Sequence, residues 1–187
     1  MGQLRNSAFL GAALVMAGCV TASRGDGIET ASLADGAVVV GGPPGYCIDP
    51  ETYPRGPDRT FAMIASCRNL TGDDTGPMVE PMVVTVTVAE QTPQATLPDA
   101  SALAEEVGQR MIGGIRSGGL TLTHLASGGT EVIADGDPRY WRGTFLQGQR
   151  MVGLALYAGK GSPLAGAEGA AMLRAVRDRI GALSPKG

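Results

Sequence analysis

The fold is organised around residues 82–89, Met82-Val83-Val84-Thr85-Val86-Thr87-Val88-Ala89. Valine and threonine fill the six central positions, and their branched side chains favour extended backbone. Val84, Val86 and Val88 fall on one face because successive side chains of a strand point to opposite sides. The stretch predicts a strand with one strongly apolar face.

A helix is expected after this strand, over residues 99–116. Asp99 follows a proline and is a residue type suited to a helix N-cap. Apolar residues then recur at helical spacing, namely Leu103, Val107, Met111 and Ile115. Gly118-Gly119 predicts the end of the helix.

The next forty residues predict a meander of four antiparallel strands joined by turns rich in glycine and aspartate. The expected strands are residues 120–126, 130–134, 139–146 and 150–158. Trp141 and Phe145 share one face of the third strand. A last helix, from Ser162-Pro163 to Leu183, has an apolar stripe of Leu173, Val176, Ile180 and Leu183.

One face of the final strand carries small residues, Gly153 and Ala155, which let a helix pack closely. We therefore expect an α+β fold, a mainly antiparallel sheet with a helix on each face (an α/β/α sandwich). Which helix covers Trp141 depends on strand order and stays open at this point.

Short strands and turn-rich loops are expected in the N-terminal third. Residues 37–40 and 60–67 predict strands, whereas glycine and proline interrupt pairing over residues 41–59. Residues 70–81 predict a surface loop. Residues 21–36 are small and polar and predict a flexible tether.

Two cysteines, Cys47 and Cys67, lie in this region. In an oxidising compartment they are expected to form a disulfide, worth about 3 kcal/mol through its effect on the unfolded chain. A redox pair or a metal site is the alternative, but redox pairs usually lie two residues apart and no ligand cluster is nearby.

The N-terminus carries a short apolar segment, residues 8–18, too short to span a bilayer and typical of a secretory signal. Leu14-Val15-Met16-Ala17-Gly18-Cys19 resembles the lipobox of bacterial lipoproteins, with Met16 where leucine is commonest. The resemblance implies cleavage before Cys19 and lipid attachment to it. An ordinary signal with a chance cysteine is the alternative.

The lipobox resemblance divides the chain into a signal peptide (1–18), a lipidated tether (19–37) and one globular domain (38–187), which is long enough for a sizeable core. Val20 stands where lipoproteins retained in the inner membrane carry aspartate, which implies the outer membrane, facing the periplasm. The formal net charge of −3 argues against a nucleic-acid partner and against electrostatic capture by anionic lipid.

One group of side chains suggests a contact with a protein partner. The aromatic and arginine residues of the proline-rich loop are Tyr46, Tyr53, Arg55 and Arg59. Such residues are enriched in interface centres. Packing of the loop on its own sheet explains them equally well.

Catalysis would rest on His124, the only histidine. A general base needs a partner within reach, and no motif supplies one. The acidic pairs Asp73-Asp74 and Asp135-Gly136-Asp137 lack the further ligands that calcium needs. The chain has no nucleophile elbow, phosphate loop, zinc motif or dinucleotide fingerprint, so no cofactor, metal or catalytic residue is expected.

The order of the predicted elements over residues 38–183 resembles that of PsbP-like domains. The Gly-Pro-Pro-Gly-Tyr-Cys-Ile-Asp segment that ends at Asp49 resembles a segment of uncharacterised Gram-negative lipoproteins. The first resemblance implies a non-catalytic binding or envelope-accessory role, and the second implies no particular activity. The alternative is a lipid-tethered hydrolase, which would need a cleft that places His124 beside Asp135 or Asp137.

Overall fold

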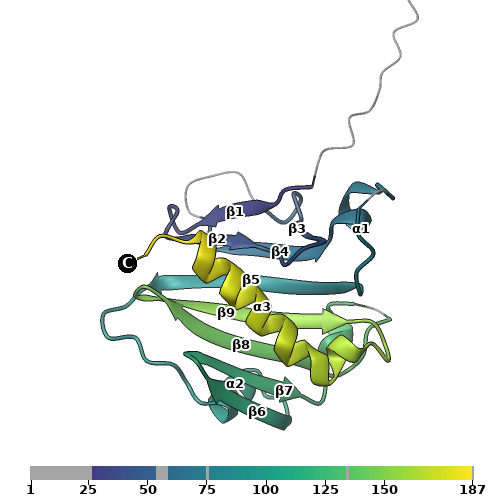
Figure 1. The fold of residues 1–187 in the computed structure, drawn as a ribbon. Coiled ribbons are helices and arrows are strands. Elements are labelled where there is room, and N and C mark those ends of the chain that lie inside the picture. The colour runs from purple at the N-terminus through teal and green to yellow at the C-terminus, as the bar shows by residue number, and fades with distance from the viewer. Residues whose placement is uncertain (1–26, 54–58, 75, 134, 187) are drawn as a thin grey trace, which may run out of the picture.

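The computed structural model describes residues 27–53, 59–74, 76–133 and 135–186. Its main sheet has seven antiparallel strands in the order β3-β4-β5-β9-β8-β7-β6 (Figure 1). These strands are β3 (Tyr46–Ile48), β4 (Phe61–Ser66), β5 (Met82–Gln91), β6 (Met111–Ser117), β7 (Leu120–Leu125), β8 (Tyr140–Gln147) and β9 (Arg150–Ala158). A separate two-stranded sheet consists of β1 (Thr30–Leu33) and β2 (Val38–Gly41).

Helices are few, and the fold is α+β with a mostly antiparallel sheet. They are α1 (Cys67–Thr71), α2 (Ala100–Glu106) and α3 (Ala167–Leu183), with two short 3₁₀ turns, η1 (Gly129–Glu131) and η2 (Pro163–Ala165). None of the helices in the described ranges is long and apolar enough to cross a membrane.

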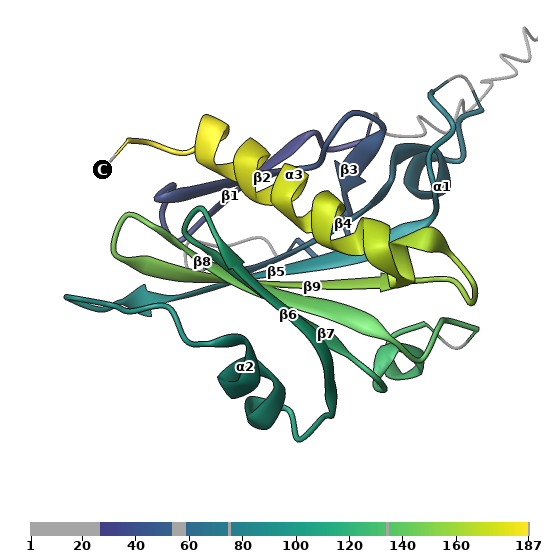
Figure 2. The ribbon, with the colours of Figure 1, turned by 60° about the horizontal axis from the view of Figure 1, so that its bottom comes forward.

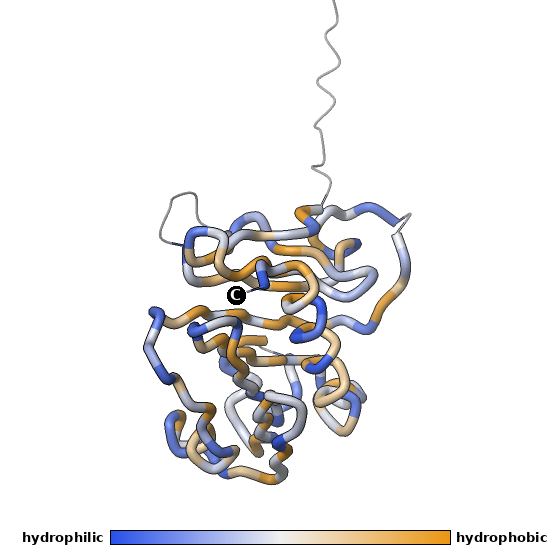
Figure 3. Tube along the Cα trace, turned by 60° about the vertical axis from the view of Figure 1, so that its left-hand side comes forward, coloured by the Kyte–Doolittle hydropathy of each residue, from blue (hydrophilic) through white to orange (hydrophobic). Residues whose placement is uncertain are grey.

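β5, the strand predicted from residues 82–89, lies between β4 and β9. Val84 and Val86 are fully buried, whereas Val83 and Thr85 on the opposite face are half-buried. In Figure 3, apolar stretches follow the stacked strands and hydrophilic ones gather at turns.

The main core lies on the face that holds Val84 and Val86. α3 and the β1–β2 sheet cover this face (Figures 1 and 2). Leu173, Val176 and Ile180 of the predicted stripe are fully buried. The core is closed by apolar side chains of both sheets and the last helix.

Trp141 packs against the start of α3, which settles the choice of helix that the sequence left open. Its Nε1–H donates a hydrogen bond of 2.8 Å to the carbonyl of Gly166. A Cβ on Gly169 would clash with Trp141 Cδ1 and with the carbonyl oxygen of Leu164, so only glycine allows the helix to approach this closely. Trp141 and Phe145 share the core-side face of β8, as predicted.

The predicted helix over residues 99–116 is wrong beyond Glu106. α2 ends there, Gly108 adopts a φ of 62°, and the chain continues as β6 paired with β7. Gly113 and Gly114 disfavour a helix, and pairing with β7 outweighs the four-residue apolar spacing. Met111 is 41% exposed, so that spacing did not mark a buried stripe.

The predicted four-stranded meander is present, but its strands are β6, β7, β8 and β9. Residues 130–134, predicted as one of the four strands, are not a strand. The chain after β7 makes the η1 turn instead of a strand. A Cβ on Gly129 would clash with the carbonyl oxygen of Asp137, so the backbone is folded tightly onto itself. This close approach is incompatible with the predicted extended segment.

Order also begins earlier than the predicted tether boundary at residue 37. Ala31 and Leu33 alternate with polar residues in β1 and are almost completely buried. Ala34 and Asp35 adopt positive φ values that turn the chain into β2. The prediction missed this two-residue alternation because most residues of the segment are small or polar. Residues 1–18 of the predicted signal and residues 19–26 of the predicted tether lie outside the described residues.

α2 packs on β6 and β7, and Figure 2 shows it well separated from α3. Its Ala104 joins Leu125, Tyr140 and Ala155 in a small second cluster. α2 is too short to extend this cluster along the sheet. The small-residue face of β9 therefore stays partly open, and both Gly153 and Tyr157 are half-buried.

Candidate binding site at the disulfide

Cys47 and Cys67 form a disulfide, as predicted. It joins β3 to the first residue of α1, directly after β4. A Cβ on Gly27 would lie 2.7 Å from Cys47 Sγ, so the first described residue rests on the bond. The disulfide thus joins β3 to α1 at the edge of the main sheet, and Gly27 packs against it.

The loop before Cys47 is held in one course by close contacts. A Cβ on Gly42 would lie 2.5 Å from the carbonyl oxygen of Tyr46. Gly45 has a φ of 87°, where side chains are strained, and a Cβ there would meet Val79 at 2.5 Å. The Tyr46 N–H donates to the Pro43 carbonyl at 3.0 Å, which closes the turn.

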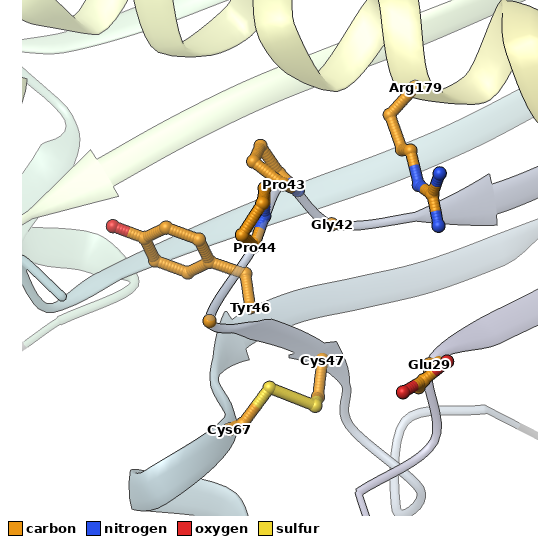
Figure 4. Close-up of a pocket in the computed structure, with 9 residues that line it drawn as sticks. Glu29, Gly42, Pro43, Pro44, Tyr46, Cys47, Cys67 and Arg179 are labelled. Atoms are coloured by element: carbon orange, nitrogen blue, oxygen red, sulfur yellow. A yellow bond between two sulfur atoms is a disulfide. The ribbon is translucent and has the colours of Figure 1, made fainter. Parts of the chain in front are cut away.

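A pocket opens between this loop and α3 (Figure 4). Its lining consists of Glu29, residues 42–47, Cys67 and Arg179. In Figure 4, Arg179 projects from α3 and Glu29 from the segment before β1, on either side of the pocket. The proline rings and the disulfide supply apolar surface in the same pocket as the two opposite charges.

Neither charge of the pocket forms an ion pair with another described residue. Glu29 and Arg179 are both exposed and remain hydrated. A bound segment that places a cation near Glu29 and an anion near Arg179 would complement the pocket. This chemistry suits recognition of a peptide or a protein surface, because apolar and charged groups alternate in such segments.

Among the described members of the predicted contact group, only Tyr46 lines the pocket, and its ring points away from Arg179 and Glu29 (Figure 4). Its hydroxyl donates to the carbonyl of Glu80 at 2.8 Å. Burial raises the pKa of this hydroxyl. Tyr46 therefore anchors the loop to the segment before β5.

Tyr53 and Arg59 come together at a different place, on β1. Arg59 Nη1 donates to the Tyr53 hydroxyl at 2.5 Å, and the guanidinium lies 4.7 Å from the ring centroid. The same hydroxyl accepts from Ser32 N at 3.1 Å and donates to Ser32 O at 3.0 Å. Packing of the loop on its own chain accounts for this pair; Arg55 lies outside the described residues.

His124 shares the core-side face of β7 with Leu120 and Leu122, as its position predicted. Its ring stacks on Trp141 with centroids 4.3 Å apart. Nε2 lies 2.9 Å from the carbonyl oxygen of Ala165 and carries the proton, because a carbonyl can only accept. Burial lowers the pKa of His124, which favours the neutral ring.

The carboxylate of Asp137 is engaged elsewhere. It accepts from the Arg139 guanidinium at 2.9 Å, from the backbone N–H of the same residue at 3.0 Å, and from Gly161 N at 3.2 Å. These donors hold the pKa of Asp137 far below its usual range. Asp137, in the turn expected at residues 135–137, therefore connects the segment before β8 to the loop before η2.

Sequence reasoning missed the two charged residues of the pocket. Glu29 fell in the predicted tether, and Arg179 lies in the predicted last helix outside its apolar stripe. They are 150 residues apart, so no local spacing relates them. No family model, curated protein or solved structure matches this chain.

Proposed function

We propose that this chain is a lipoprotein of the outer membrane, held by lipid on Cys19 and facing the periplasm, that binds another envelope protein without catalysing a reaction. The pocket at the disulfide is the proposed contact. The observation that carries the proposal is the pair of opposite charges, Glu29 and Arg179, which line the same pocket as the two prolines and the disulfide and pair with no other described residue.

The position of the pocket supports its link to the anchor. Gly27, eight residues after Cys19, touches the disulfide. At about 3.3–3.6 Å per residue, eight residues reach at most about 29 Å. Lipid on Cys19 would therefore keep the disulfide end of the domain close to the bilayer, where a neighbouring membrane protein could be met.

A binding role is favoured over the tethered hydrolase by the surroundings of His124. Its Nε2–H is committed to Ala165, one ring face is covered by Trp141, and the Asp137 carboxylate is bound to Arg139 and Gly161. Deprotonating a nucleophile would require a free ring nitrogen beside an orienting carboxylate. The Asp137 carboxylate is held by Arg139 and Gly161, and no described hydrogen bond joins a carboxylate to His124.

We also propose an α/β/α arrangement similar to that of PsbP-like domains, with α3 on one side of the sheet and α2 on the other. Its support is that the cluster beneath α2 uses Leu125 and Tyr140, which alternate along β7 and β8 with residues of the main core. The shortness of α2 makes the second layer incomplete. This resemblance would fit an accessory role, and it does not identify a ligand.

Cys19→Ala tests the anchor. The variant is expected to leave the membrane fraction and to carry no lipid, because two or more acyl chains are needed for stable anchoring. Thr21→Ala, two residues away, is the matched control and should stay with the membrane. A Cys19→Ala protein that still sediments with membranes after a carbonate wash contradicts the anchor.

Arg179→Ala tests the pocket. Crosslinking in intact envelopes is expected to yield an adduct with the wild type that is lost in the variant. Arg174→Ala, earlier in α3, is the control and should keep the adduct. An adduct of equal yield in all three proteins would place the contact elsewhere.

A further inference from the structure

Three of the strand edges in the described chain are covered by other groups. Tyr53 bonds the outward N–H and C=O of Ser32 on β1. Ser184 does the same for Val39 on β2, accepting at 2.9 Å and donating at 3.5 Å. On β3, the Ile48 N–H donates to Ile28 O at 2.7 Å, so Ile28 occupies that edge of the main sheet.

β6, at the other edge of the main sheet, has no such cover. Within the described ranges, its backbone pairs with β7 on one side, with a register shift between Met111 and Gly113, and no other strand follows. Met111 and Ile112 at its start are each 41% exposed. An uncovered row of N–H and C=O groups beside exposed apolar side chains is a template for pairing with another strand.

We propose that β6 pairs with β6 of a second copy of this chain, antiparallel and about a two-fold axis, so that the two seven-stranded sheets join into one. An edge-to-edge contact between β6 and β3 of another copy is blocked, because Ile28 already occupies β3. A contact of the same edge with itself remains, and such a contact closes as a dimer.

The side chains of β6 suit this self-pairing. Gly113 and Gly114 at its centre carry no side chains, and the space beside Gly114 is taken by Ala100 of α2, which a Cβ on Gly114 would meet at 2.8 Å. Arg116 is the only charge on the strand, and it already pairs with Asp99 of its own chain at 2.5 Å. A two-fold axis centred on Gly114 places Arg116 opposite Ile112 of the other copy, so like charges do not face each other.

A foreign extended segment is the competing occupant. β6 offers it backbone groups but, at two central positions, no side chain by which to select one sequence over another. A second copy has the same glycine-centred strand and is always present at the same location. The inference is independent of the lipid anchor and of the pocket at the disulfide.

The test uses the mature chain from residue 19 with Cys19→Ser, which carries no lipid, in sedimentation velocity over a wide concentration range. A reversible dimer is expected. Ile112→Lys should weaken the dimer about tenfold or more, because two lysines are brought to the joined edge. Met78→Lys is the matched control: Met78 is 84% exposed in the loop before β5 and should leave the dimer constant unchanged.

Hydrogen exchange of the same samples identifies the surface used. Backbone amides of β6 are expected to exchange more slowly as concentration rises, while those of β5 do not change. Circular dichroism confirms that Ile112→Lys is folded. A chain that stays monomeric throughout, a dimer that Ile112→Lys leaves intact, or β6 amides whose exchange ignores concentration would each overturn the proposal.

Discussion

The two ends of the main sheet are built in opposite ways. At the β3 end, a disulfide, a bridging segment at Ile28 and the small β1–β2 sheet cover the outer strand. At the β6 end, the described chain leaves the strand edge open, and neighbouring loops are held by polar contacts such as Arg116–Asp99. Within the described chain, one end of the sheet is therefore crosslinked and covered, and the other ends in a strand that pairs on one side only.

Val176→Asp should have the largest effect, because it strikes the helix that packs across the main core. Val176 is fully buried on the core-side face of α3, and an unpaired charge there costs several kcal/mol of a typical stability of about 5–15 kcal/mol. Thermal melts are expected to show unfolding at much lower temperature. Ala175→Asp, at the exposed neighbouring position, is the control; equal melting of the two variants would mean that α3 is not docked.

Removal of the disulfide should have the second largest effect on stability, and it should loosen only the β3 end of the main sheet. The double variant Cys47→Ala, Cys67→Ala is expected to lose about 3 kcal/mol in urea unfolding. Hydrogen exchange should accelerate in β3 and β4 and remain unchanged in β6 and β7. Faster exchange at both ends alike would show that the two ends are not separate in stability.

Asp137→Asn should lower stability, because it weakens the contacts of the Asp137 carboxylate with Arg139 and with Gly161 in the loop that leads into η2. The folded-state pKa of Asp137 lies below that of the unfolded chain, so its contribution is present above the unfolded pKa and is lost as pH falls through the folded value. The wild type should therefore lose part of its stability in acid, and Asp137→Asn should lose that part already at neutral pH.

Melting temperatures measured from neutral pH into the acid range check the prediction about Asp137. Asp135→Asn is the control, since Asp135 is exposed and its carboxylate takes no part in the contacts with Arg139 and Gly161. Two melting curves that fall in parallel with pH for the wild type and Asp137→Asn would rule out this source of acid sensitivity.

Tyr53→Phe should have the smallest effect on stability, about 1 kcal/mol, because it removes one hydroxyl and leaves the N–H and C=O of Ser32 to water. It should also open the β1 edge and make the covered end resemble the β6 end. Urea unfolding measures the loss. Tyr157→Phe is the control, because no hydrogen bond among the described residues uses the Tyr157 hydroxyl, and a greater loss there would contradict the assignment.

The sequence predicted elements wherever the local pattern agreed with the final packing. β5 has alternating valines, α3 has a stripe that is buried as a unit, and Cys47 and Cys67 are the two cysteines outside the N-terminal apolar segment and its boundary. Prediction failed at residues 107–117, where apolar spacing favoured a helix and two glycines favoured an end to it. Hydrogen bonding to β7 decided in favour of a strand, and a local sequence pattern does not record the hydrogen bonds that a neighbouring strand supplies.

Residue order by itself determined the central strand and the last helix, because each rests on a pattern of neighbouring residues. Tertiary structure alone decided the pocket, which needs Glu29 and Arg179 from distant parts of the chain, and the roles of Tyr53 and Ser184 as edge covers. It also decided which edge of the sheet stays open. Those features depend on strand order, and strand order is set by long-range burial and hydrogen bonding that no local pattern records.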